Sequence, residues 1–236
     1  MESTSSAISS ARSQPSSRER WALVLCLALT AILVVTAFLS QAGGDDADSS
    51  GQLFFDYEFA IGSTIVYGFF VLVTFLIARL LPDPRVNLGF VRPVRRWIWI
   101  GLGIAVGGII VAAALEPLLH AGEDQGLTPT EWESGRAPAF VLSCLAVVLV
   151  APFAEELLYR GLGVRVLAFA GAPTAIAVTA LVFSASHGLV AALLPLGLFA
   201  VGLGWLRWRS ESIWPSFTAH AGYNLIGVIA AIVSLL

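Results

Sequence analysis

The sequence predicts an all-α protein that crosses a membrane as a polytopic helical bundle of about seven spans, with its N-terminus in the cytoplasm. Composition is the first reason: of 236 residues, 57% are apolar and 12% are charged, a balance typical of integral membrane proteins. The second reason is that the apolar residues form runs long enough to cross a hydrocarbon core of about 30 Å. The third is that arginine is concentrated in alternate loops.

The N-terminal region contains a polar tail and a first apolar run. Residues 1–20 are rich in serine and include three arginines, which predicts a disordered cytoplasmic tail. Residues 21–40 are apolar over a longer stretch than the roughly 7–15 residues of a signal peptide. We therefore interpret this run as an uncleaved first span. A signal peptide cleaved near Ser40-Gln41-Ala42 is the alternative.

The later spans follow from the remaining apolar runs and the loops between them. A Gly171-Ala172-Pro173 turn separates two of them, because glycine ends a helix and proline begins the next one. We expect three units, namely the tail (1–20), three N-terminal spans (21–138) and a four-helix catalytic core (139–236). The spans are expected at 21–40, 59–81, 97–119, 139–170, from 174 onward, 190–208 and 213–236.

The charges of the loops predict the orientation. Loop 82–96 holds four arginines, whereas segments 41–58 and 120–138 are mostly acidic. By the positive-inside rule, the arginine-rich loops face the cytoplasm. Six tryptophans at the predicted cytoplasmic boundaries agree with this assignment, since indole favours the membrane interface.

Two adjacent carboxylates, Glu155 and Glu156, lie inside the fourth apolar run. A charged group near the bilayer centre costs about 2.5–3.5 kcal/mol on the lenient insertion scales, so such groups face a partner or a wet cavity. Two further polar clusters follow in later spans, Phe183 to His187 and His220 to Asn224.

Helix arithmetic places these clusters at a common depth. Glu155 lies sixteen residues before Gly171, and His187 lies sixteen residues after it, so both are about 24 Å from that turn in an antiparallel pair of helices. His220 and Asn224 lie about 12 and 18 Å along the last span, counted from Ser212. We therefore expect one pocket, facing the cytosol, built by three helices.

Spacing within each helix suggests a division of labour. Glu156 and Arg160 are four residues apart, acid before base, which favours an ion pair on one helix face. Glu155 is turned about 100° away from Glu156 and is left as the base facing the cavity. The pairs Phe183/His187 and His220/Asn224 each share a face in the same way.

These groups are suited to hydrolysing a peptide bond. A carboxylate whose pKa is raised by burial, together with an imidazole, can activate a shared water for attack on a carbonyl. Glu155 and His187 suit that role. His220 and Asn224 suit the stabilisation of the oxyanion, where one donor contributes roughly 10²–10³ in rate.

The three motifs, Glu-Glu-x-x-x-Arg, Phe-x-x-x-His and His-x-x-x-Asn in successive apolar helices, resemble the CPBP intramembrane protease family. That family includes the type II CAAX prenyl endopeptidases and bacterial relatives described as abortive-infection or bacteriocin-immunity proteins. The resemblance covers about 139–225. It implies Glu155 as the base, His187 as its partner on the water, and His220 with Asn224 at the oxyanion. Glu156, Arg160 and Phe183 are the expected structural support.

Metal dependence has two readings. Glu155, His187 and His220 could ligate zinc, but no closely spaced His-Glu-x-x-His pair of ligands is present. We expect a glutamate mechanism with no cofactor. The alternative is a metal-dependent mechanism with zinc.

The function expected from the sequence is thus that of an intramembrane endopeptidase, a multi-pass protein of the cell membrane. All the basic residues are arginine and the chain is rich in Ala and Gly, which suggests a bacterial plasma membrane. The expected substrate is a peptide or a membrane protein, with prenylated proteins among the candidates, and no nucleic-acid partner is expected. A non-catalytic membrane scaffold or immunity-type protein is the alternative. A transporter fits less well because the sequence shows no internal repeat.

Overall fold

The computed structural model describes residues 14–43, 50–121, 129 and 131–233. Within them the chain forms helices and connecting segments with no β-strand, which confirms the all-α prediction. The separate long helices are α2 (Ser17–Gly43), α3 (Tyr57–Ala78), α5 (Arg95–Leu119), α9 (Ala172–Ala185), α10 (Leu193–Ser210) and α11 (Trp214–Val233). Short helices are η1 (Ser50–Phe55), α4 (Pro84–Asn87), η2 (Ser134–Arg136) and η5 (Ala168–Ala170).

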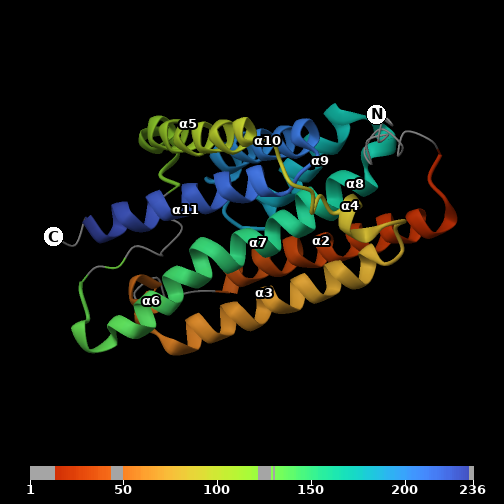
Figure 1. Ribbon diagram of the computed structural model, residues 1–236. Coiled ribbons are helices and arrows are strands. Elements are labelled where there is room, and N and C mark those ends of the chain that lie inside the picture. The colour runs from red at the N-terminus through yellow and green to blue at the C-terminus, as the bar shows by residue number, and fades with distance from the viewer. Residues whose placement is uncertain (1–13, 44–49, 122–128, 130, 234–236) are drawn as a thin grey trace.

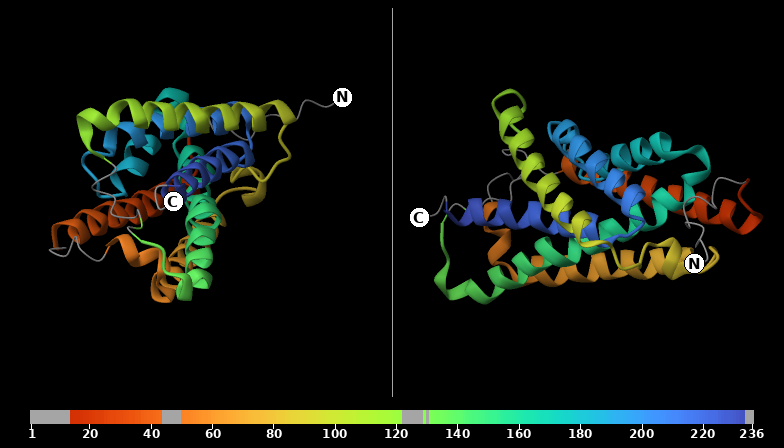
Figure 2. Two further views of the ribbon diagram at one scale, coloured as in Figure 1. Left: turned by 90° about the vertical axis from the view of Figure 1, so that its left-hand side faces the viewer. Right: turned by 45° about the horizontal axis from the view of Figure 1, so that its top comes forward.

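One continuous helical run fills the space between η2 and η5, and it carries the two glutamates. Its segments are α6 (Ala137–Leu145), η3 (Ala146–Val150), α7 (Ala151–Glu155), η4 (Glu156–Gly163) and α8 (Val164–Val166). In Figure 1 this run lies alongside α3, with α11, α10 and α5 on its other side. Figure 2 shows that α5 and α10 cross the direction of the run rather than following it.

The described residues contain five helical segments long and apolar enough to cross a membrane, which confirms a multi-pass membrane protein. Helix α9 has 14 residues and so extends only about 21 Å, less than a hydrocarbon core of about 30 Å. Helix α10 ends in a turn that carries Arg207 and Arg209. The total of seven spans and the cytoplasmic N-terminus therefore stay predictions. The five segments are Ser17–Ala42, Tyr57–Ala78, Arg95–Leu119, Ser134–Val166 and Trp214–Val233.

The first helix begins earlier than the tail boundary predicted at residue 20. The hydroxyl of Ser16 accepts from the Glu19 N–H at 3.3 Å, and the Glu19 carboxylate accepts from the Ser16 N–H at 2.9 Å. This reciprocal pair is a capping box, which starts a helix. Glu19 also forms a 2.7 Å ion pair with Arg165. Residues 17–20 are thus helical, and residues 1–13 of the predicted tail lie outside the described residues.

The end of the bundle that carries the arginines is closely packed. Arg207 donates to the Asn87 carbonyl at 2.9 Å, and the Ser212 hydroxyl donates to the Val91 carbonyl at 2.7 Å. Gly89 has a positive φ of 85°, and a Cβ added there would lie 2.8 Å from Arg207 Nε. Glycine is the residue that permits both this backbone conformation and this approach.

Close packing of α5 against α11 depends on one glycine and gives a matched test. A Cβ added at Gly101 would lie 2.6 Å from the Pro215 carbonyl oxygen, whereas one added at Gly103 meets nothing within 4 Å. Gly101→Ala is expected to destabilise the protein by about 1–3 kcal/mol through overpacking. Gly103→Ala is expected to be neutral or slightly stabilising, since alanine is the better helix former. Thermal unfolding of both variants in detergent checks this, and equal midpoints would contradict it.

Candidate active site

The helical run that carries the glutamates is widened twice into π-helix. Segment η3 ends just before Pro152, whose ring cannot fit an ordinary α-helical turn and which has no N–H. Segment η4 begins at Glu156. The two glutamates therefore lie on either side of the junction between α7 and η4. Such π-helical turns occur often at functional sites.

Glu156 and Arg160 form a sealed ion pair, as their spacing predicts. Arg160 Nη1 lies 3.0 Å from Glu156 Oε1, and both side chains are fully buried. Arg160 Nη2 also donates to the Ala200 carbonyl at 3.1 Å. The guanidinium carbon lies 4.4 Å from the centre of the Phe183 ring, within the range of a cation–π interaction. Phe183, which the sequence predicts as structural support, thus contacts this cation.

His220 lies between the two carboxylates. Its Nδ1 is 3.0 Å from Glu156 Oε1, so Glu156 accepts from both Arg160 and the imidazole. Its Nε2 is 3.6 Å from Glu155 Oε2. Donation from Nδ1 to Glu156 leaves Nε2 as the nitrogen that faces Glu155. Glu156 therefore orients the imidazole as well as pairing with Arg160.

Glu155 is held by a residue that the sequence analysis did not identify. The Tyr67 hydroxyl, on α3, donates to Glu155 Oε1 at 3.1 Å. The side chain of Glu155 keeps 15% of its surface exposed, in contrast to the fully buried Glu156. The division between a sealed and an accessible carboxylate thus matches the expectation from spacing. The sequence did hold one signal for this role: Tyr67 lies in the middle of an apolar span, where a buried hydroxyl needs a hydrogen-bond partner.

His187 ends the α9 region on the same cavity. Its Nδ1 lies 2.9 Å from the Phe183 carbonyl oxygen, one turn back along its own chain. Donation to that carbonyl fixes the ring and leaves Nε2 as the available nitrogen. The ring also packs edge-on against Phe183, with centroids 4.9 Å apart. The expected water shared by His187 and Glu155 stays a prediction, and the side chains directly beside Glu155 are Tyr67 and His220.

Asn224 donates the backbone hydrogen bond that Pro152 cannot donate. In a π-helix the carbonyl of Val147 would accept from residue 152, which is a proline without an N–H. The Asn224 amide donates to that carbonyl at 2.8 Å, and this contact fixes which side of the amide carries the nitrogen. One N–H of Asn224 is thereby used. Its second N–H is the one that could serve an oxyanion.

These groups border a common cavity of about 480 Å³. Glu155, His187, His220 and Asn224 all line it, so the structure brings the four residues expected at the site to one place. Phe183 and Tyr67 also line it, whereas Glu156 and Arg160 lie behind its wall. A second cavity of about 530 Å³, between α2 and α3, also includes Glu155 and Tyr67 in its lining.

The zinc alternative depends on how the histidines and carboxylates of the site are placed. Among residues 14–43, 50–121, 129 and 131–233, no group of three or more His, Cys, Asp or Glu side chains is placed to hold a metal ion. Nδ1 of His220 is directed at Glu156, and Nδ1 of His187 at a backbone carbonyl, so Nε2 is the available nitrogen of each ring. The zinc alternative therefore also stays a prediction. No reaction step is therefore routed through a metal here, and the cofactor-free mechanism stays a prediction.

Comparison with known families identifies the C-terminal part of the chain. Residues 137–226 match the family described as Rce1-like, type II CAAX prenyl endopeptidase Rce1-like. Comparisons with curated proteins and with solved structures found no match. The matched region holds the three motifs, and it excludes Tyr67. The resemblance that the motifs indicate is thus confirmed: this region is that of a CPBP intramembrane protease.

Proposed function

We propose that this member of the CPBP intramembrane proteases hydrolyses a peptide bond in or near the bilayer with a water activated by Glu155. The family match supports a CAAX-protease-type endopeptidase in general, and the glutamate mechanism is our own inference. One observation carries it: of two adjacent carboxylates within the membrane, one is neutralised and buried, and the other borders a cavity with two imidazoles and a carboxamide.

The proposed reaction begins at Glu155. Its carboxylate takes a proton from the water as the water oxygen attacks the peptide carbonyl carbon. His187 Nε2 accepts a hydrogen bond from the same water, because Nδ1 is committed to the backbone. The protonated Glu155 then returns the proton to the amide nitrogen of the leaving group as the C–N bond breaks. Atoms and charge balance without a cofactor.

The oxyanion would be stabilised by His220 and Asn224. His220 can donate from Nε2 only when its ring carries both protons, because Nδ1 already donates to Glu156. The second N–H of Asn224 provides another donor. This arrangement assigns the catalytic roles to Glu155, His187, His220 and Asn224, with Glu156 and Arg160 as positioning residues.

The substrate that we propose is a peptide or a membrane protein in a bacterial plasma membrane. Prenylated proteins belong to this class of candidates because of the family description. Membranes from cells producing the wild-type chain or Glu155→Ala can be compared by mapping of protein N-termini. New N-termini that occur only with the wild type would identify substrates. If both chains give equal biological activity and identical N-termini, the protein acts as a non-catalytic scaffold.

Tyr67 is expected to position the base. Tyr67→Phe removes one hydrogen bond to a carboxylate, an interaction that contributes about 1.5–3 kcal/mol, so kcat is expected to fall by about tenfold or more. KM is expected to change little, because the hydroxyl contacts the base. Tyr57→Phe, on the exposed first turn of the same helix, is the matched control. A normal kcat for Tyr67→Phe would show that Glu155 does not need this contact.

A further inference from the structure

The cavity beside Glu155 extends toward only one end of the bundle. On α3 it is lined by Phe59, Ser63 and Tyr67. Tyr67 lies ten residues into this 22-residue helix, about 15 Å from its start. The lining residues of α3 therefore occupy its first half, which follows the acidic segment 41–58.

The lining residues of α11, α6 and α7 lie toward the same end of the bundle. On α11 every lining residue lies between His220 and Ala231, toward the C-terminal end, and none lies nearer Trp214. Along the run from α6 to α7 the lining stops at Glu155. These segments begin or end at the acidic side, and the rest of the wall comes from the end of α9, the loop after it and the first half of α10.

The opposite end is filled by side chains. Arg160, Leu81, Leu88 and Ile213 are each between 0 and 4% exposed. Aromatic rings from α3, the loop after α4 and α11 also contact one another and the ring of Phe153 on α7, at centroid distances between 5.9 and 6.5 Å. They are Phe75, Phe90, Phe153, Trp214 and Phe217. Neither of the two cavities that border Glu155 is lined by Arg160, Leu81, Leu88 or Ile213.

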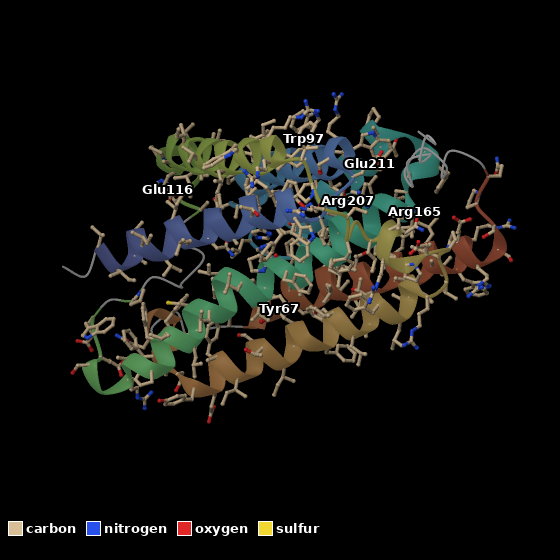
Figure 3. The ribbon with its side chains drawn as sticks, viewed as in Figure 1. Tyr67, Trp97, Glu116, Arg165, Arg207 and Glu211 are labelled. Atoms are coloured by element: carbon tan, nitrogen blue, oxygen red, sulfur yellow. The ribbon has the colours of Figure 1, made fainter. Side chains whose placement is uncertain are left out.

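The two ends differ in charge as well as in packing. Figure 3 shows Arg165 and Arg207 on one side of the molecule, with Tyr67 near the middle of α3. The arginine-rich end also carries Arg79, Arg85, Arg92, Arg95 and Arg96, whereas the mouth of the cavity carries Asp56, Glu58, Glu131 and Glu133, with one arginine, Arg136. By the positive-inside rule, the closed end faces the cytoplasm and the open end faces away from it.

We infer that the site receives its substrate from the non-cytoplasmic side of the membrane. The expected substrate is a membrane-anchored protein whose cleaved segment lies just outside its anchor on that side. The second cavity supports an anchored substrate, because Val66 lines it and is 48% exposed on the lipid-facing surface. This inference rests on the proposed function for the cleavage itself, and it replaces the cytosolic opening expected from sequence.

The test is the sidedness of thiol labelling in a chain whose two cysteines, Cys26 and Cys144, are replaced by alanine. Ser63→Cys places a thiol in the cavity wall. Val94→Cys and Leu118→Cys, with side chains 64% and 76% exposed at opposite ends of α5, report the two faces. Each variant is treated with a membrane-impermeant sulfonated maleimide, in spheroplasts and in inside-out vesicles.

We expect the Ser63→Cys thiol to react in spheroplasts, together with that of Leu118→Cys, and to lose this labelling in inside-out vesicles. The Val94→Cys thiol is expected to show the reverse. Labelling of Ser63→Cys from the cytoplasmic side, from neither side, or in a chain with inverted controls would overturn the inference. Labelling requires no turnover, so a failure of the proposed protease activity is seen separately, as absent cleavage with normal labelling.

Discussion

Glu155→Gln is expected to reduce the rate of peptide cleavage by about 10²–10⁴-fold, the usual contribution of a positioned general base. Glutamine has nearly the same shape as glutamate, and its carbonyl oxygen can still accept from the Tyr67 hydroxyl, which lies 3.1 Å from Glu155 Oε1. It cannot take a proton from water at neutral pH. The loss should therefore appear in kcat with little change in thermal stability. The measurement is turnover of an identified substrate by purified protein in liposomes.

Glu58→Gln is the matched control, since Glu58 is an exposed carboxylate near the cavity mouth. It should retain full turnover, which would separate loss of a base from loss of negative charge. If Glu155→Gln retains wild-type kcat, another group activates the water, and the glutamate mechanism is wrong. Adding imidazole or formate to a truncated Glu155→Ala variant gives a further readout, because a base can be restored chemically but a misfolded protein cannot.

The sequence was sufficient to predict the ion pair and the common pocket. Glu156 and Arg160 lie 3.0 Å apart, as an acid and a base four residues apart on a helix should. The depth argument also placed residues of three helices on one cavity. Both predictions depend on local geometry and helix rise, which hold even where the helix widens into π-turns.

The partner assignments could not be predicted in the same way. The water that Glu155 and His187 are expected to share stays a prediction, whereas the side chains beside Glu155 are Tyr67 at 3.1 Å and His220 at 3.6 Å. Which side chains meet depends on the rotation of each helix, and the π-segments around Pro152 alter that rotation. Tyr67 was missed because α3 carries no motif, and only tertiary packing brings its hydroxyl to Glu155.

The side of the membrane on which the cavity opens could not be predicted from helix depth either. Counting residues from the Gly171 turn gives a level along the membrane normal, but it does not tell from which side water reaches that level. That depends on which end of the bundle is filled. Rings such as Phe90 and Trp214, with centroids 6.0 Å apart, lie toward the arginine-rich end, and the sequence alone does not reveal that they meet.

Arg160→Met is expected to destabilise the protein by about 3–5 kcal/mol, because it leaves the buried Glu156 carboxylate without its counter-charge. The same substitution also removes the hydrogen bond to the Ala200 carbonyl. Unfolding in mixed micelles of mild detergent and SDS measures the change. The double variant Glu156→Gln/Arg160→Met should recover much of the loss, since it removes both charges of the pair together.

An exposed pair in the same chain provides the comparison for this argument. Arg136 and Asp56 lie 3.2 Å apart, with side chains 56% and 49% exposed, and Asp56→Asn should cost about 0–1 kcal/mol, as surface pairs do. An equal effect at both pairs would show that burial does not govern the Glu156–Arg160 interaction. The double variant also tests the second role of Glu156, because the amide oxygen introduced at that position can still accept from His220 Nδ1. If turnover returns along with stability, the charged pair serves the fold; if stability alone returns, the pair also serves to position His220 beside Glu155.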